Sequence, residues 1–266
     1  MNIIKPDYLS QVTHQIAIGR SDSDAIFSTA SSFLYKYNEE IYLITNWHNA
    51  TGRNPISGEP LSKHSGIPTV FVTYFRLKQK DGSANKTIIN LYHDDEFQKP
   101  CWLVHPAYKN KVDVVAIKLT QNEAFHYFPI NNYDFENDIP PEVSDEVFIL
   151  GYPFEDFRYL GLPIWKKGSI ATEPDVDEDQ LPKLLVDTAT RSGLSGSPVI
   201  FQRIGIHKME NGLMKDDSII GRIRGFLGVY SGRIGQSEIH AQLGIVWKGK
   251  VIDEIIEGGQ FGTCEF

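Results

Sequence analysis

The sequence predicts an all-β fold, and three observations lead to this prediction. Segments rich in Val, Ile, Tyr, Phe and Thr recur along the chain, separated by clusters of Gly, Pro, Asn and Asp, as is typical of short strands and turns. A polar, acidic stretch at 131–141, which ends in Pro140-Pro141, divides these segments into two groups. Helical periodicity is scarce. We therefore expect two β-units of similar size, with any functional site in the cleft between them.

The individual elements follow from the same pattern. One short helix is expected at about 250–257, where Val251, Ile255 and Ile256 recur at helical spacing and Gly258-Gly259 ends the pattern. The expected strands cover residues 26–37, 40–45, 69–77, 87–92, 114–119, 146–152, 163–172, 184–188, 197–202, 219–230 and 240–247.

Composition excludes several classes of function. The chain has 266 residues, of which 41% are hydrophobic and 23% charged, as in an ordinary globular domain. Its formal net charge of −8 opposes nucleic-acid binding. No apolar run approaches the roughly 20 residues of a membrane-spanning helix. The first residues lack the apolar core of a secretory signal, so the sequence predicts a cytoplasmic protein.

Three other features have plain structural explanations. Cys101 and Cys264 are distant in sequence and favour two free thiols, with one long-range disulfide as the alternative. The acidic stretch 173–179 is typical of a solvated loop tip; the alternative is a lip that attracts basic substrates. The 93–95 segment, His-Asp-Asp, together with His105 offers metal ligands, but its spacing matches no helix-borne zinc motif, so loop acids are the better interpretation.

The most informative segment surrounds Ser195, in the sequence Ser192-Gly193-Leu194-Ser195-Gly196-Ser197-Pro198. An apolar strand leads into this segment, and Pro-Val leads out of it. Glycines on both sides of Ser195 permit the tight backbone that points neighbouring N–H groups the same way. A serine held in this manner, beside aligned N–H groups, suits nucleophilic attack on an acyl carbon. The alternative is an ordinary Gly/Ser turn between strands.

A serine nucleophile needs a base and a group that orients the base. His48 is the best placed of the eight histidines, because it follows the apolar segment 41–45 where that strand is expected to end. Asp113 opens the apolar run 114–119, where its carboxylate would be shielded and within reach of an imidazole N–H. Taken singly, His48 would be a half-buried histidine and Asp113 a turn residue at a strand start.

Together these motifs resemble the trypsin-like (chymotrypsin-fold) serine peptidases. His48 follows Leu-Ile-Thr at 43–45, Asp113 opens a strand, and Ser195 lies in Gly-x-Ser-Gly-x-Pro. The chain order His, Asp, Ser is also the order in that family. The resemblance covers about residues 25–250.

The resemblance is closest to bacterial trypsin-like peptidase domains, including the protease domain of the HtrA group. These share Asp187 eight residues before the serine and the strand at 147–153. The family implies two six-stranded antiparallel β-barrels with the active site at their junction. In this chain they would form a single domain over 1–266, with barrels at about 14–130 and 140–249 followed by the helix.

The resemblance also implies roles for individual residues. Ser195 would be the nucleophile, His48 the general base and Asp113 the group that orients it, with the N–H groups of Gly193 and Ser195 forming the oxyanion hole. The family needs no cofactor and acts on protein or peptide substrates. The residues that would bind the substrate are Ala189, Thr190, Ser231, Gly232 and Arg233. The resemblance also implies that Ser231, in the strand that would pair with the substrate, supports the orienting Asp113.

Four residues or segments depart from the family pattern. Ser197 replaces the second glycine after the nucleophile, Leu194 replaces an aspartate, and Arg233 stands where many relatives have glycine. No Ile-Val-Gly-Gly activation sequence is present, which together with Leu194 favours an enzyme made without zymogen cleavage. Ala189, at the expected floor of the primary pocket, carries no charge and predicts cleavage after small or medium uncharged residues.

Two other functions remain open from the sequence. One is a catalytically silent binding module that keeps the fold without turnover. The other is an ester hydrolase using the same chemistry, although the α/β-hydrolase version requires the chain order Ser, Asp, His, which differs from the order here.

Overall fold

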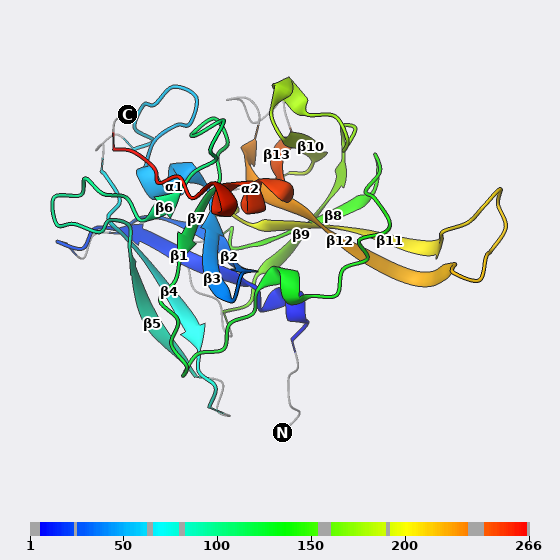
Figure 1. Ribbon diagram of the computed structural model, residues 1–266, viewed down its shortest axis with the longest axis horizontal. Helices are drawn as coiled ribbons and strands as arrows, with labels where there is room; N and C mark the ends of the chain where they lie inside the picture. Colours follow the sequence, from blue (N-terminus) through cyan, green and yellow to red (C-terminus); the bar gives the residue numbers. More distant parts are fainter. Residues whose placement is uncertain are drawn as a thin grey trace.

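Strands are the main regular structure of the computed structural model in Figure 1, which describes residues 6–23, 26–62, 66–79, 83–153, 161–189, 192–233 and 242–264. They form two antiparallel sheets, which confirms the all-β prediction. The first sheet contains β1 (Thr13–Gly19), β2 (Ile26–Tyr37), β3 (Glu40–Thr45), β4 (Val70–Arg76), β5 (Ala84–Asn90), β6 (Trp102–Leu103) and β7 (Val115–Lys118).

The first sheet has the order β5-β4-β1-β2-β3-β7-β6. It has one strand more than the six that the resemblance implies, and β6 is only two residues long. Its two ends meet where the Cys101 N–H donates to the Leu91 carbonyl at 2.8 Å. The hairpin that joins β5 to β6 therefore brings the edges of the sheet together.

The second sheet is a closed barrel of six strands in the order β10-β13-β12-β11-β8-β9. Closure leaves no free sheet edge around the barrel wall. Its strands are β8 (Glu146–Gly151), β9 (Ile164–Ile170), β10 (Lys183–Asp187), β11 (Pro198–His207), β12 (Ile219–Arg233) and β13 (Leu243–Lys248).

Helices are few and short. The C-terminal helix α2 (Lys250–Gly258) extends the expected 250–257 by one residue and ends at Gly259, which is left-handed with φ 58°. The helix α1 (Trp47–Thr51) follows β3 directly. The 3₁₀ segments within the described residues are η1 (Tyr8–Ser10), η2 (Ile130–Asn132) and η4 (Glu178–Gln180), each of a single turn. In the described part of the chain, no helix has the length and apolar character needed to cross a membrane.

Three apolar clusters hold these elements together. One fills the first sheet and another fills the barrel. The third lies between the two sheets and includes Phe33 of β2, Ile200 of β11 and the buried face of α2, Val251, Ile252 and Ile255. Apolar surface removed from water in this third cluster holds the two sheets against each other. Residues of the first sheet and of the barrel that meet at this contact therefore keep fixed positions relative to one another.

Two strands and one helix were not expected from the sequence. Every residue of β1 is buried, including Thr13, His14 and Gln15. Because several buried positions of β1 are polar, its sequence lacks the apolar run or alternation by which a strand is recognised. The strand β6 is too short to have a recognisable pattern. His48, expected where a strand ends, lies instead within α1, because β3 ends at Thr45.

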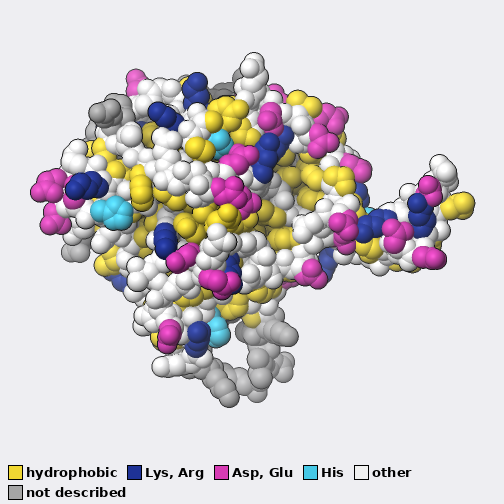
Figure 2. Space-filling view, in the orientation of Figure 1, with side chains coloured by type: hydrophobic (Ala, Val, Ile, Leu, Met, Phe, Trp, Pro, Cys, Tyr) yellow, Lys and Arg dark blue, Asp and Glu magenta, His cyan; other side chains and the backbone are white. Residues whose placement is uncertain are grey.

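One hairpin extends beyond the body of the protein. The outer halves of β11 and β12 pair only with each other beyond Gln202 and form the arm at the right of Figure 1. Its exposed apolar side chains include Ile204, Leu213 and Ile220. On the face in Figure 2, acidic and basic side chains are interspersed along the arm and over the body, without a continuous basic area.

His14 makes the stability of the fold depend on pH. Its ring is buried in β1 against Phe75, and burial lowers the pKa of His14 from 6.5 to about 4, with the nearby charge of Arg76 acting in the same direction. The unfolded chain therefore binds a proton between about pH 6.5 and 4 that the folded chain excludes, so stability falls as the pH falls through this range.

We expect urea unfolding at pH 5 to show a loss of about 2 kcal/mol from His14 relative to pH 7. His14→Gln removes this titration, so the variant should lose less stability than the wild type over the same pH interval. Equal losses of stability in the two proteins would show that the pKa of His14 is not the cause of this pH dependence.

Candidate active site

His48 and Asp113 form a hydrogen-bonded pair. The His48 Nδ1 lies 2.7 Å from Asp113 Oδ2, and the backbone N–H of His48 donates to Asp113 Oδ1 at 2.9 Å. Asp113 is only 2% exposed and lies just before β7. Because β7 pairs with β3, and β3 leads into the helix α1 that contains His48, the two residues lie side by side. Because a carboxylate only accepts hydrogen bonds, Nδ1 carries the ring proton and Nε2 keeps a free lone pair.

Ser231 links this pair to Ser195. Its hydroxyl donates to Asp113 Oδ2 at 2.5 Å, and its carbonyl accepts a long 3.3 Å hydrogen bond from Ser195 Oγ. Asp113 thus receives three donors and bridges the first sheet to β12 of the barrel. The structure therefore brings His48, Asp113, Ser231 and Ser195 into one cluster, although these residues come from distant parts of the sequence.

The Ser195 hydroxyl does not bond to His48 in this structure. Among the hydrogen bonds of the described residues, its partner is the Ser231 carbonyl. The His48 side chain is 15% exposed, so it is mostly buried but still reaches solvent. Rotation about the Cα–Cβ bond of Ser195 moves its hydroxyl between rotamers at little cost, and such contacts are often loose without substrate.

Glycines on either side of Ser195 shape the loop. Gly193 has φ 92° and Gly196 has φ 84°, in the left-handed region that favours glycine. A Cβ on Gly193 would lie 2.3 Å from the Tyr152 carbonyl oxygen, and one on Gly196 only 2.1 Å from that of Ser31. Both positions therefore require glycine for conformation and for space.

The loop leaves two N–H groups available. In the hydrogen bonds of the described residues, those of Gly193 and Ser195 have no acceptor, whereas the Gly196 N–H donates to the Tyr230 carbonyl at 2.8 Å. Unpaired N–H groups beside the half-buried Ser195 hydroxyl suit the stabilisation of a developing oxyanion. These are the two groups that the resemblance nominated.

Several supporting residues were missed from the sequence. The Asn46 side-chain amide donates to the Asp113 carbonyl at 2.7 Å, and Thr45 Oγ1 donates to the Ser31 carbonyl at 2.9 Å. Asn49 Nδ2 in turn donates to Thr45 Oγ1. A polar cluster around His48, in Thr-Asn-Trp-His-Asn, was the only sequence signal for them. Ser31 lies in β2 and had no signal at all.

The expected substrate-binding residues lie at two places. Ala189 follows β10 and is exposed, whereas Thr190 lies outside the described residues. Ser231, Gly232 and Arg233 form the end of β12. Gly232 and Arg233 pair with β13 on one side, and among the described residues no strand covers their other side.

The side chains considered as possible metal ligands have other partners in the structure. His105 Nε2 lies 2.8 Å from Glu254 Oε2, and the Asp94 carboxylate accepts the N–H groups of Gln98 and Lys99. The described residues contain no cluster of three His, Cys, Asp or Glu side chains arranged to hold a metal.

The two thiols and the acidic stretch also have defined surroundings. Cys101 and Cys264 are free thiols, in line with the first of the two alternatives. In the acidic stretch, Asp177 pairs with Lys248 and Asp179 with Lys183.

Comparisons with known proteins give matches only among solved structures. No protein-family model matches the chain, and no curated protein sequence does. A serine endoprotease from Yersinia pestis is 14% identical, with 96% of this chain and 67% of that chain covered and a TM-score of 0.49. The Rv3671c protease of M. tuberculosis in its active form is 15% identical, with 97% and 83% covered and a TM-score of 0.48.

The inactive form of Rv3671c is 17% identical, with 95% and 90% covered and a TM-score of 0.46. These three solved structures are thus one serine endoprotease and two forms of a second protease. At such identities, and with TM-scores below 0.5, the chemistry of this chain has to be derived from its own His48, Asp113 and Ser195.

Proposed function

We propose that the protein is a serine endopeptidase in which Ser195 attacks the substrate, His48 moves the proton and Asp113 orients His48. The observation that supports this most is the continuous set of contacts from Ser195 through Ser231 and Asp113 to His48. It joins a nucleophile, an acid and a base from three parts of the chain. A purely structural cluster would have no need for a half-buried hydroxyl at one end and an imidazole that still reaches solvent at the other.

The first half of the reaction uses the free lone pair of His48. Ser195 Oγ bonds to the carbonyl carbon of the peptide while its proton passes to His48 Nε2. The carbonyl oxygen becomes an anion and accepts the N–H groups of Gly193 and Ser195. When the anion collapses, the C–N bond breaks and His48 returns the proton to the leaving amine.

The second half repeats the cycle with water. His48 takes a proton from water, whose oxygen attacks the acyl-enzyme carbonyl, and Ser195 regains a proton as the acid product leaves. The Asp113 carboxylate stabilises the imidazolium formed in each half. Ser231 helps to hold that carboxylate, since its hydroxyl occupies one of the acceptor positions.

The end of β12 supports a peptide as the substrate. Ser231 to Arg233 form a strand edge next to Ser195, and an extended peptide would gain backbone hydrogen bonds there. An ester without a peptide backbone would lack these bonds. This difference favours peptide hydrolysis over ester hydrolysis as the natural activity.

A non-catalytic binding module is the second candidate, favoured by the Ser195 hydroxyl bonding to the Ser231 carbonyl instead of His48. Labelling with a fluorophosphonate probe separates the two candidates. The wild type should be labelled at Ser195, and Ser195→Ala should not. Folded wild-type protein that resists labelling over hours would support the binding module.

The side chain before the cleaved bond should be small or medium in size and uncharged. Ala189, near the proposed primary pocket, brings no charge to attract Lys or Arg, and size alone discriminates by about 1–3 kcal/mol per methylene. A peptide library digested by the wild type and read by mass spectrometry measures this preference. Strong selection for Arg or Lys at that position would refute it.

A further inference from the structure

Ser31 in β2 makes an unusual set of contacts with the loop around Ser195. It is completely buried. Its hydroxyl donates to the Gly193 carbonyl at 2.8 Å, and its backbone N–H donates to the Ser195 carbonyl at 2.9 Å. A single residue of the first sheet therefore holds two carbonyl groups of a loop that belongs to the barrel.

These two bonds restrict how the loop presents the Ser195 N–H. The N–H of Ser195 belongs to the peptide unit whose carbonyl is that of Leu194, which accepts the Ser197 N–H at 3.0 Å. Ser31 holds the peptide units immediately before and after this one. Because each peptide unit is planar, fixing a carbonyl fixes the direction of the N–H on the same unit. The Ser195 N–H is thus held between two anchored units.

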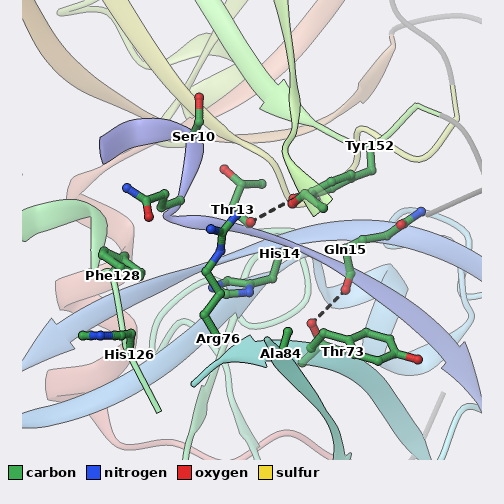
Figure 3. Close-up of a pocket in the computed structure, with 13 residues that line it drawn as sticks. Ser10, Thr13, His14, Gln15, Thr73, Arg76, Ala84, His126, Phe128 and Tyr152 are labelled. Carbon is green, nitrogen blue, oxygen red and sulfur yellow. Dashed lines mark hydrogen bonds between the residues drawn. The ribbon is translucent and has the colours of Figure 1, made fainter. Parts of the chain in front are cut away.

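The Ser31 hydroxyl is itself held by Tyr152. It accepts the Tyr152 N–H at 3.0 Å while donating to Gly193, so its single proton is directed to the loop. Figure 3 shows the Tyr152 side chain beside a cavity of about 80 Å³, with its hydroxyl bonded to the Thr13 carbonyl. The Gly161 carbonyl lies 2.8 Å from the same hydroxyl. Burial raises the pKa of Tyr152, so the phenol remains a donor at neutral pH.

The Tyr152 carbonyl adds a steric limit. It lies so close to Gly193 that a Cβ there would be 2.3 Å away. The Gly193 residue is therefore confined between the Tyr152 carbonyl and the Ser31 hydroxyl. In an alternative loop conformation, the Gly193 carbonyl would turn toward the substrate and lose its hydrogen bond from the Ser31 hydroxyl. That buried hydroxyl would then have no acceptor, which is unfavourable.

We propose that Ser31 is a positioning residue that holds the oxyanion-binding loop in its active conformation through the bond from its hydroxyl to the Gly193 carbonyl. This inference rests on the proposed peptidase function and deepens it. Ser31 does not touch the substrate. It acts through Gly193 and Ser195, so it should affect stabilisation of the anion more than binding of the peptide.

The neighbouring residue offers a matched control. Ser32 is also completely buried in β2, but its hydroxyl donates to the His14 carbonyl at 3.1 Å, away from the loop. Ser31→Ala and Ser32→Ala each remove one buried hydroxyl from the same strand. We expect kcat on a peptide substrate to fall about 10- to 100-fold in Ser31→Ala, with KM within about twofold of the wild type, and little change in Ser32→Ala.

A second measurement reports on the anion site itself. A peptide aldehyde forms a tetrahedral adduct with the serine and places an oxyanion in the loop. Its inhibition constant should rise in Ser31→Ala by about the same factor as kcat falls, while the KM of the substrate stays constant. A merely structural loss would not produce this parallel change.

Folding of the variants has to be separated from positioning. Thermal unfolding measures the stability of each variant, and Ser31→Cys keeps the packing while providing a weaker donor. Its kcat should lie between those of the wild type and Ser31→Ala, and a kcat below that of the wild type still tests the proposal even if Ser31→Ala does not fold. Wild-type kcat in Ser31→Cys, or equal kcat losses in Ser31→Ala and Ser32→Ala, would overturn the proposal. A wild type that neither cleaves peptides nor reacts with fluorophosphonate would overturn the peptidase function instead.

Discussion

Replacing Ser195 with alanine is expected to lower kcat for peptide hydrolysis by at least about 10⁴-fold while the protein remains folded. The variant keeps the N–H groups of the loop but has no atom that can form the acyl-enzyme. His48→Ala should lose a similar factor, because the hydroxyl is a weak nucleophile without a base. Combining the two substitutions should add little, since the two side chains act in the same step.

Steady-state kinetics of the single and double variants measure this non-additivity. Ser192→Ala is the matched control, because Ser192 lies in the same loop and is exposed. It should retain activity close to the wild type. Two single variants whose losses multiply in the double variant would mean that His48 and Ser195 act independently, which contradicts the proposed proton transfer.

Substituting Asp113 by asparagine should have the second largest effect, a loss of about 10³- to 10⁴-fold in kcat, as expected for the orienting acid of such a site. The carboxylate accepts from the backbone and the ring of His48 and from Ser231. An amide offers one acceptor and one donor in its place. The His48 ring would then take the other tautomer, with its proton on Nε2, where it cannot accept from Ser195.

Asp145→Asn is the control for this substitution. Asp145 is also a buried aspartate, but its carboxylate pairs with Arg203 at 2.6 Å in the barrel. Its replacement should lower the free energy of unfolding without changing kcat. If both aspartate variants reduce kcat equally, the effect of Asp113→Asn would come from stability and not from the orientation of His48.

Local patterns were sufficient for much of the fold. β3 and β2 begin and end where the alternation of apolar and turn residues predicts, at Glu40–Thr45 and Ile26–Tyr37. The helix α2 follows from its spacing and from Gly259. These elements are recognisable because each is rich in apolar residues at a regular spacing or in a continuous run, and each carries its own stop signal. β1 lacks such a signal, since it is buried on all sides with polar residues in it.

The site also has some features that the sequence predicts and others that it does not. The residue types at His48, Asp113 and Ser195 are recognisable in the chain itself. So is a tight turn at glycines 193 and 196, because a turn with positive φ excludes most side chains wherever it occurs. Two features were decided only by the tertiary structure: the Ser195 hydroxyl turns to the Ser231 carbonyl, and Ser31 holds the loop. The physical reason is that a hydrogen bond depends on distance and direction between groups far apart in sequence, which arise only when the two sheets pack together.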